Sequence, residues 1–334
     1  MNVLILTQPM LNNYGGILQN FALQHALEKF EYQPYTIDWL PPQKSLYFYV
    51  RSWLKTIVLS LVGKKRPFAK IEKLRCRNEN FNDFVNAFVR KTVCTRGINA
   101  ACLKGSDVVV VGSDQVWRPK YNYRIKEMFL DFCKKRKHLK RIAYAASFGV
   151  DNWEFTPKQT RVCAKLAKKF DAISVREESG VKLCKEHLGV NAAWVLDPTL
   201  LLKKEDYLPI CRDVPVNNEK YLAVYVLDEN EKVTVTYEKE AATRGLVVKK
   251  FHADSKSTLT VPEWLAMFRD ASYVVTDSFH GTVFSIIFGK EFKCINNKGR
   301  GAARFESLLN LYNSGKLDEM CEFSLNWLRN ALEN

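Results

Sequence analysis

The most chemically suggestive stretch of the chain runs from Tyr273 to Thr282 and reads YVVTDSFHGT. An expected strand over 273–276 leads to Ser278, a residue type typical of helix N-caps, and a helix with glycine and apolar residues follows at once. The first N–H groups of such a helix lack partners and carry the positive end of its dipole, so they suit a phosphate or a carboxylate. His280 stands on this turn, where an imidazole can serve as acid or base near neutral pH. An ordinary capped helix with a structural histidine is the alternative.

A second candidate is Arg176, within the stretch ISVREES. It lies just past the carboxyl end of a short expected strand. There, an arginine that faces a cleft can grip a carboxylate or a phosphate with two N–H groups. The alternative is a local ion pair with one of the neighbouring carboxylates, which are Asp171, Glu177 and Glu178.

Two polar loops are expected at one edge of the N-terminal sheet. One reads NNYGG, with glycines that allow a ligand to approach the backbone closely, and the other reads GSDQVW and follows a run of valines. Their hydroxyl, carboxylate, amide and indole groups suit a sugar. Neither loop has the glycine spacing of a dinucleotide or ATP site, and tight strand-to-helix turns are the alternative. The candidate ligand-binding residues here are Asn13, Tyr14, Gly15, Ser113, Asp114, Gln115 and Trp117.

The rhythm of the sequence predicts an α/β fold with two domains. Short β-branched runs alternate with longer amphipathic stretches, as in parallel sheets covered by helices. A polar stretch at 212–220 separates two such series, so we expect an N-terminal domain over 1–212 and a C-terminal domain over 213–334. Two Rossmann-like sheets would then face a central cleft and bind ligands at the carboxyl ends of their strands. The expected strands are 3–7, 35–39, 107–112, 128–132, 141–147, 172–175, 193–196, 221–227, 246–251, 273–276 and 291–295.

Composition points to a protein that is expected in the cytoplasm. The first residues, NVLILT, do not form a signal peptide, and no run approaches the ~20 apolar residues of a membrane span. The 9 cysteines include no CxxC pair. They therefore favour buried free thiols over a zinc cage or a disulfide framework, and we expect no metal.

The net charge of +15 falls entirely in the first half of the chain. Residues 1–150 carry 25 Lys+Arg against 10 Asp+Glu (25 − 10 = 15), and residues 151–334 carry 26 of each. A basic half suggests an anionic partner, and no nucleic-acid motif accompanies it. An anionic membrane surface or a lipid diphosphate is the expectation, with a merely soluble basic surface as the alternative. The very apolar stretch 46–62 predicts either an interfacial helix on the inner leaflet or a cover over the N-terminal sheet.

Six phrases, in order, resemble those of the polysaccharide pyruvyl transferase family: NYGGILQNFALQ, GSDQVW, AASFG, SVREES, DPTL and DSFHG. The resemblance implies a fold like that of GT-B glycosyltransferases. It also implies that phosphoenolpyruvate, a substrate rather than a cofactor, gives its pyruvate to two sugar hydroxyls as a ketal and releases inorganic phosphate. The acceptor would be a surface polysaccharide or its lipid-linked oligosaccharide precursor.

The resemblance also implies roles for residues. His280 matches the family's histidine before a glycine, and Arg176 matches its arginine after the short strand, so both are candidates for catalysis. Many members place another arginine two residues before that histidine, where this chain has Ser278. Two later arginines are candidates to replace it. The expected donor-binding residues are therefore Ser278, Phe279, Gly281, Arg300 and Arg304, and the two N-terminal loops would bind the acceptor.

Two other functions stay open. One is a glycosyltransferase of the same architecture that uses a nucleotide-sugar donor, although no clear acidic ribose-binding signal is present in the C-terminal half. The other is a non-catalytic member of the family that lies at a membrane surface. Binding of phosphoenolpyruvate or of a nucleotide sugar would distinguish these functions.

Overall fold

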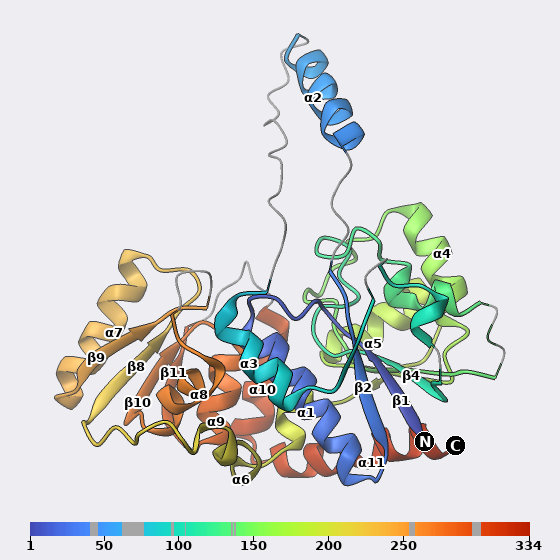
Figure 1. Ribbon diagram of the computed structural model, residues 1–334. Helices are drawn as coiled ribbons and strands as arrows, with labels where there is room; N and C mark the ends of the chain where they lie inside the picture. The colour runs from blue at the N-terminus through green and yellow to red at the C-terminus, as the bar shows by residue number, and fades with distance from the viewer. Residues whose placement is uncertain are drawn as a thin grey trace.

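The computed structural model describes residues 1–40, 46–61, 77–94, 97–103, 105–134, 136, 138–253, 258–295 and 302–334. Its described part contains two parallel β-sheets, each with helices packed on it, which lie side by side (Figure 1). The expected fold class, two α/β domains, is confirmed.

The first sheet has the strand order β3-β2-β1-β4-β5-β6-β7, and every neighbouring pair is parallel. All four valines of β4 are buried, as expected for a central strand covered on both faces. The strands are β1 (Asn2–Leu6), β2 (Gln33–Asp38), β3 (Lys91–Val93), β4 (Val108–Val111), β5 (Lys140–Ala146), β6 (Ala172–Val175) and β7 (Ala193–Trp194). The helices of this part are α1 (Tyr14–Lys29), α2 (Leu46–Leu61), α3 (Glu79–Phe88), α4 (Pro157–Ala167), α5 (Glu178–Leu183) and α6 (Lys204–Tyr207).

The second sheet has the order β11-β10-β8-β9 and is also parallel throughout. Its strands are β8 (Tyr221–Tyr225), β9 (Val247–Phe251), β10 (Tyr273–Thr276) and β11 (Glu291–Cys294). Its helices are α7 (Glu231–Arg244), α8 (Val261–Arg269) and α9 (Phe279–Ile287), followed by α10 (Ala302–Asn313) and α11 (Leu317–Glu333).

Each sheet has one point at which the strand order reverses, and this point predicts where a ligand binds. In the first sheet it lies between β1 and β4, and in the second between β8 and β10. The loops that leave adjacent strands there run to opposite sides, which opens a crevice at the carboxyl ends of the strands. The crevice of the first sheet therefore begins after Leu6 and Val111, and that of the second after Tyr225 and Thr276.

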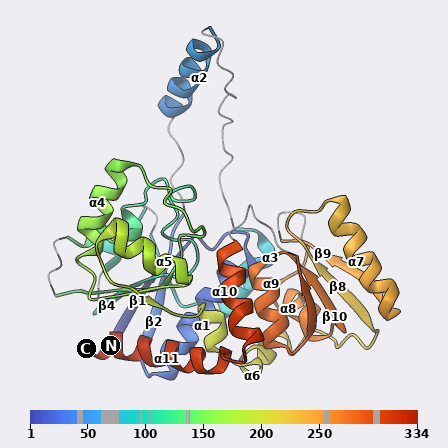
Figure 2. The ribbon, with the colours of Figure 1, turned by 180° about the vertical axis from the view of Figure 1, so that it is seen from behind.

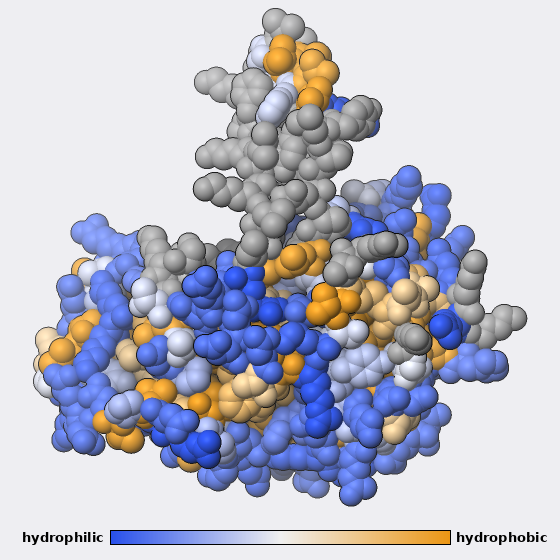
Figure 3. Space-filling view, in the orientation of Figure 1, coloured by the Kyte–Doolittle hydropathy of each residue, from blue (hydrophilic) through white to orange (hydrophobic). Residues whose placement is uncertain are grey.

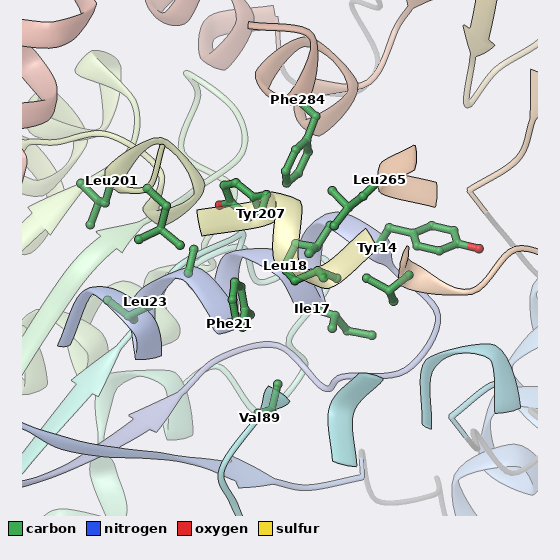
Figure 4. Close-up of a cluster of buried hydrophobic side chains, with 14 of the residues drawn as sticks. Tyr14, Ile17, Leu18, Phe21, Leu23, Val89, Leu201, Tyr207, Leu265 and Phe284 are labelled. Atoms are coloured by element: carbon green, nitrogen blue, oxygen red, sulfur yellow. The ribbon is translucent and has the colours of Figure 1, made fainter. Parts of the chain in front are cut away.

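Helix α1 forms much of the interface between the two domains. Its residues from Tyr14 to Leu27 are nearly all inaccessible. They include Gln19, Asn20 and Gln24, whose side chains are hydrogen-bonded inside the fold. Figure 4 shows its side chains with Val89 on one side and with Tyr207, Leu265 and Phe284 on the other. Tyr14 stacks on Trp264 with 5.1 Å between ring centroids, and its hydroxyl donates to the carbonyl oxygen of Leu259 at 2.5 Å. The interface is thus largely a hydrophobic core shared by the two domains.

The last helix returns to the first domain. Figure 2 shows α11 passing beneath the first sheet, with the two termini close together. The hydroxyl of Ser324 accepts from the N–H of Leu196, and Lys140 donates to the carbonyl oxygen of Leu332 at 2.8 Å. The boundary expected after residue 212 falls between the last turn before β8 and β8 itself, but α11 packs on the N-terminal side of it.

Two expectations differ from the structure. The segment 128–132, expected as a strand, forms two short 3₁₀ turns separated by Leu130, whose φ of +56° is incompatible with a strand. Cys94 and Cys102, expected as free thiols, are joined by a disulfide. A sequence separation of 8 closes only a small loop, so this bond is a local link rather than a framework.

Candidate active site

A cleft of about 910 Å³ lies between the domains. Residues from 8–15 and 114–121 line it on the N-terminal side, and residues from 225–229, 252–253 and 277–280, with Phe305, on the C-terminal side. Apart from Phe305, these residues lie at or just after the ends of β1, β4, β8, β9 and β10. The cleft therefore joins the crevices of both sheets.

The turn between β10 and α9 brings His280 into this cleft. Ser278 caps the helix, since its side chain accepts from the N–H of Gly281 at 3.3 Å. The cap fixes the direction in which the first turn projects, and His280 is 8% exposed at the cleft surface. Its Nε2 lies 3.9 Å from Oδ2 of Asp197. A carboxylate thus lies beside the imidazole, a type of side chain that can act as acid or base.

Asp197 and Arg176 form a buried ion pair below the floor of the cleft. Nη1 of Arg176 donates to Oδ2 of Asp197 at 2.6 Å, and the side chains are 1% and 0% exposed. The other oxygen of Asp197 accepts from the backbone and the hydroxyl of Thr199. Burial alone would raise the pKa of Asp197, but Arg176, His280 and Thr199 together hold that pKa below its usual range. Asp197 is therefore ionised at neutral pH.

Arg176 also contacts the loop after β4. Its Nη2 donates to Oδ1 of Asp114 at 3.3 Å, and its guanidinium lies 4.9 Å from the ring centroid of Phe279. Burial would lower the pKa of Arg176, but the carboxylates of Asp197, Asp114 and Glu177 raise it above its usual value. One guanidinium thus connects a carboxylate beside His280 with a carboxylate at the cleft surface.

Asp114 is presented to the cleft by a strained loop. Its φ is +67°, a left-handed conformation that is uncommon outside glycine but that aspartate tolerates. Its carbonyl oxygen accepts from the N–H groups of Val116 and Ser147. Just before it, a β-carbon at Gly112 would overlap the carbonyl oxygen of Tyr144, so this turn needs glycine. Such strain persists where the surroundings hold it, and it is common at functional sites.

The structure brings together only part of the set that the sequence suggests. The predicted residues that line the cleft are Asn13, Gly15, Asp114, Gln115, Ser278, Phe279 and His280. Those that do not line it are Tyr14, Ser113, Trp117, Arg176 and Gly281, all of them buried. Arg300 and the side chain of Arg304 lie outside the described residues.

The residues that the cleft excludes have identifiable structural partners. Trp117 is in the core, where it stacks on Phe129 at 4.7 Å and donates to the carbonyl oxygen of Met128. Ser113 donates to Ala145 and to Asp197 at 3.2 Å each. Arg176 pairs with Asp197 and Asp114 instead of the sequence neighbours offered as its alternative.

Asp197 is the residue that sequence reasoning passed over. It belongs to the segment DPTL, which has no residue spacing that indicates catalysis or ligand binding. Its importance follows from two partners far away in the chain, Arg176 and His280, which only the fold brings to it. An aspartate before a proline after a short strand reads as a turn, and here Asp197 does cap one, with Pro198 as the first residue.

Among the residues described, no group of three or more His, Cys, Asp or Glu side chains has the geometry of a metal site. A second hollow of about 510 Å³ lies between α11 and the amino ends of β5 and β6. None of the residues that the sequence singled out for chemistry lines it. Several of those residues line the interdomain cleft instead.

The fold has two α/β domains, and several of the candidate residues for chemistry line the cleft between them. The model of the family described as polysaccharide pyruvyl transferase matches residues 13–299. The chain belongs to that family, and it is a transferase. Comparison with curated proteins found no match.

Solved structures of similar outline come from several organisms. UDP-GlcNAc 2-epimerase from Neisseria meningitidis, bound to UDP-GlcNAc, is 11% identical over 99% of both chains, with a TM-score of 0.48. UDP-N-acetylglucosamine 2-epimerase from Rickettsia bellii is 9% identical over 99% of this chain and 96% of the other, with a TM-score of 0.45. The N-terminal domain of trehalose-6-phosphate phosphatase from Candida albicans gives the same values. We draw no argument from likenesses this distant.

Proposed function

We propose that the protein transfers pyruvate from phosphoenolpyruvate, as a ketal, to two hydroxyls of a sugar in a surface polysaccharide or in its lipid-linked precursor. The observation that carries the proposal is the position of His280 beside the buried pair of Asp197 and Arg176, in the cleft of a chain that belongs to this family. An acid held next to fixed, balanced charges is what this transfer requires.

The donor is an anion, and two helix N-termini favour its binding. α9 begins at the cleft with its cap Ser278, and α1 begins on the opposite wall with its cap Asn13. The positive ends of both helix dipoles attract phosphate and carboxylate groups. Lys120 adds a cationic side chain to the same lining.

Acidic side chains of the cleft are partly offset by partners of their own. Asp114 accepts from Arg176, and Glu229 pairs with Lys250 at 2.6 Å. Asp277 accepts from the backbone N–H groups that follow β8. These contacts lessen the repulsion that an anionic donor would otherwise meet.

In the proposed reaction His280 protonates the methylene carbon of phosphoenolpyruvate, which becomes a methyl group. The neighbouring carbon then carries oxocarbenium character, and one sugar hydroxyl adds to it. Phosphate leaves, and the second hydroxyl closes the ketal. The two hydroxyl protons replace the one that His280 gave up and the one that leaves on phosphate, so atoms and charge balance. Asp114, in the cleft wall, is placed to accept a hydrogen bond from an acceptor hydroxyl.

The test compares donors. Purified protein is assayed for phosphate release and thermal shift with phosphoenolpyruvate and with a panel of nucleotide sugars, each with and without lipid-linked oligosaccharides. We expect acceptor-dependent phosphate release with phosphoenolpyruvate alone. Stabilisation and turnover with a nucleotide sugar, and none with phosphoenolpyruvate, would indicate that the protein is a glycosyltransferase. No turnover and no stabilisation with any donor would indicate a non-catalytic member of the family.

A further inference from the structure

Helix α2 exposes an apolar face to the solvent. Val50, Leu54, Ile57 and Val58 are 42%, 58%, 46% and 60% exposed. Their spacing of four, seven and eight residues puts them on one side of a helix. Figures 1 and 2 show α2 apart from both sheets, and Figure 3 shows apolar colour along its described part.

The polarity of α2 is the reverse of that expected for a helix that covers a core. Ser52 and Thr56, from the polar stripe, are 9% and 2% exposed, less than any of the four apolar residues. The hydroxyl of Thr56 donates within the helix to the carbonyl oxygen of Ser52 at 3.0 Å. Contiguous apolar surface of this kind marks a site that contacts a partner.

The chain that carries α2 leaves and re-enters the fold at the mouth of the cleft. It leaves after β2, and the described chain resumes at Arg77, whose guanidinium donates to Asp38 at the end of β2 and to the carbonyl oxygen of Met10, both at 2.7 Å. The N–H of Asn78 donates to Asn12, which lines the cleft. A surface that binds α2 is therefore brought to the cleft opening.

The positive charge of α2 indicates which partner its apolar face contacts. The α2 sequence, LYFYVRSWLKTIVLSL, contains two cations, Arg51 and Lys55, and no acidic residue. The entire excess of +15 lies in the half of the chain that contains it. Two copies of α2 packed face to face would bring like charges together, whereas an anionic lipid surface would offset them. No helix of the described part is long and apolar enough to cross a bilayer.

We propose that α2 lies in the surface of an anionic bilayer, with Val50, Leu54, Ile57 and Val58 among the lipid chains and Arg51 and Lys55 at headgroup level. The cleft is then held over the membrane. This inference rests on the proposed function only for the biological role of membrane binding, which would be to bring the cleft to a lipid-linked acceptor. Binding itself needs neither donor nor acceptor.

The experiment is co-sedimentation of the full-length protein with phosphatidylcholine vesicles, with and without phosphatidylglycerol. Wild type should bind only the vesicles with phosphatidylglycerol, and salt should release it. Leu54→Asp with Val58→Asp, and separately Arg51→Glu with Lys55→Glu, should each weaken binding about tenfold or more. Matched controls lie on α7, where Val235 is 58% exposed and Lys232 and Lys239 are exposed. Val235→Asp and the double Lys→Glu variant there should bind as wild type does.

Several results would overturn the proposal. These are negligible binding to both kinds of vesicle, equal losses in the α2 and α7 variants, or a dimer that the α2 changes dissociate without any vesicle binding. Val58→Ser, a milder change, is tested alongside so that a folding defect cannot be mistaken for lost binding. Because the assay contains no substrate, its failure leaves pyruvyl transfer standing, and failed phosphate release leaves vesicle binding intact.

Discussion

The backbone of Gly15 packs directly against the imidazole ring of His280. A β-carbon at Gly15 would overlap the ring and would lie only 2.6 Å from its Cε1. The two residues belong to different domains, one in the first turn of α1 and the other in the first turn of α9. Gly15 therefore matters because of what it faces: the first domain forms one wall of the site in which the second domain holds its histidine.

Gly15→Ala should displace the imidazole from Asp197 and reduce turnover by about 10²-fold, because small misplacements of a reacting group have effects of that order. The fold should persist, since alanine suits a helix. Phosphate release measures the loss. Gly16→Ala is the control: the atoms nearest to its β-carbon would belong to the Asn13 side chain, at 3.3 Å and beyond, and not to His280. Equal activity in the two variants would mean that the contact with His280 has no catalytic consequence.

His280→Ala should lower turnover by roughly 10²–10⁴-fold, the usual contribution of a general acid or base, and should leave the melting temperature close to that of wild type. His187→Ala serves as its control, since that ring stacks on Trp153 at 4.5 Å, away from the cleft. A folded His280→Ala protein that releases phosphate at the wild-type rate would show that His280 is not the general acid.

Much of the fold could be predicted because strands buried on both faces leave continuous apolar runs. The four valines of β4 and the alternation of strands with helices are enough to predict two parallel sheets. The turn at Ser278 could be located for a similar reason, because cap and glycine are local signals. In contrast, the return of α11 to the first sheet depends on contacts such as Ser324 with Leu196, which no local pattern announces.

The site was harder to predict because the polarity of a loop does not show which of its side chains point into the cleft and which into the core. Trp117 and Ser113 belong to a polar loop at the correct sheet edge, yet they point into the core, while Asp114 between them faces the cleft. Arg176 is recognisable as a cation after a strand, but the partner that buries it, Asp197, is 21 residues away. Such pairings are set by tertiary packing.

Arg176→Lys should lower kcat by about 10²-fold and change the donor KM little, because the buried guanidinium positions Asp197 and Asp114 and does not line the cleft. An ammonium is a point charge and cannot span both carboxylates. Arg269→Lys is the matched control, since Arg269 grips Asp270 with two N–H groups at 2.7 and 2.8 Å, outside the cleft lining. A raised KM with unchanged kcat would instead make Arg176 a donor contact.

Asp197→Asn should destabilise the protein at neutral pH by about 3–5 kcal/mol, the usual cost of leaving one member of a buried ion pair without its counter-charge. The effect should also depend on pH. The folded pKa of Asp197 is lower than its ordinary value, since the effect of Arg176, His280 and Thr199 exceeds that of burial. Its ionised form therefore contributes stability that is complete above the unfolded pKa of about 3.9 and is lost as pH falls through the folded pKa.

The measurement is thermal unfolding of wild type and Asp197→Asn from neutral to acid pH. The difference in stability between them should be constant above about pH 5 and should shrink steadily below about pH 4. Asp270→Asn is the control, because its pKa is also lowered, although burial opposes the effect of Arg269 and Asn217. It should show the same trend with a smaller difference, since Asp270 is less completely buried than Asp197. A difference for Asp197→Asn that stays constant down to pH 3 would contradict the ionised pair beside His280, since loss of packing alone does not titrate.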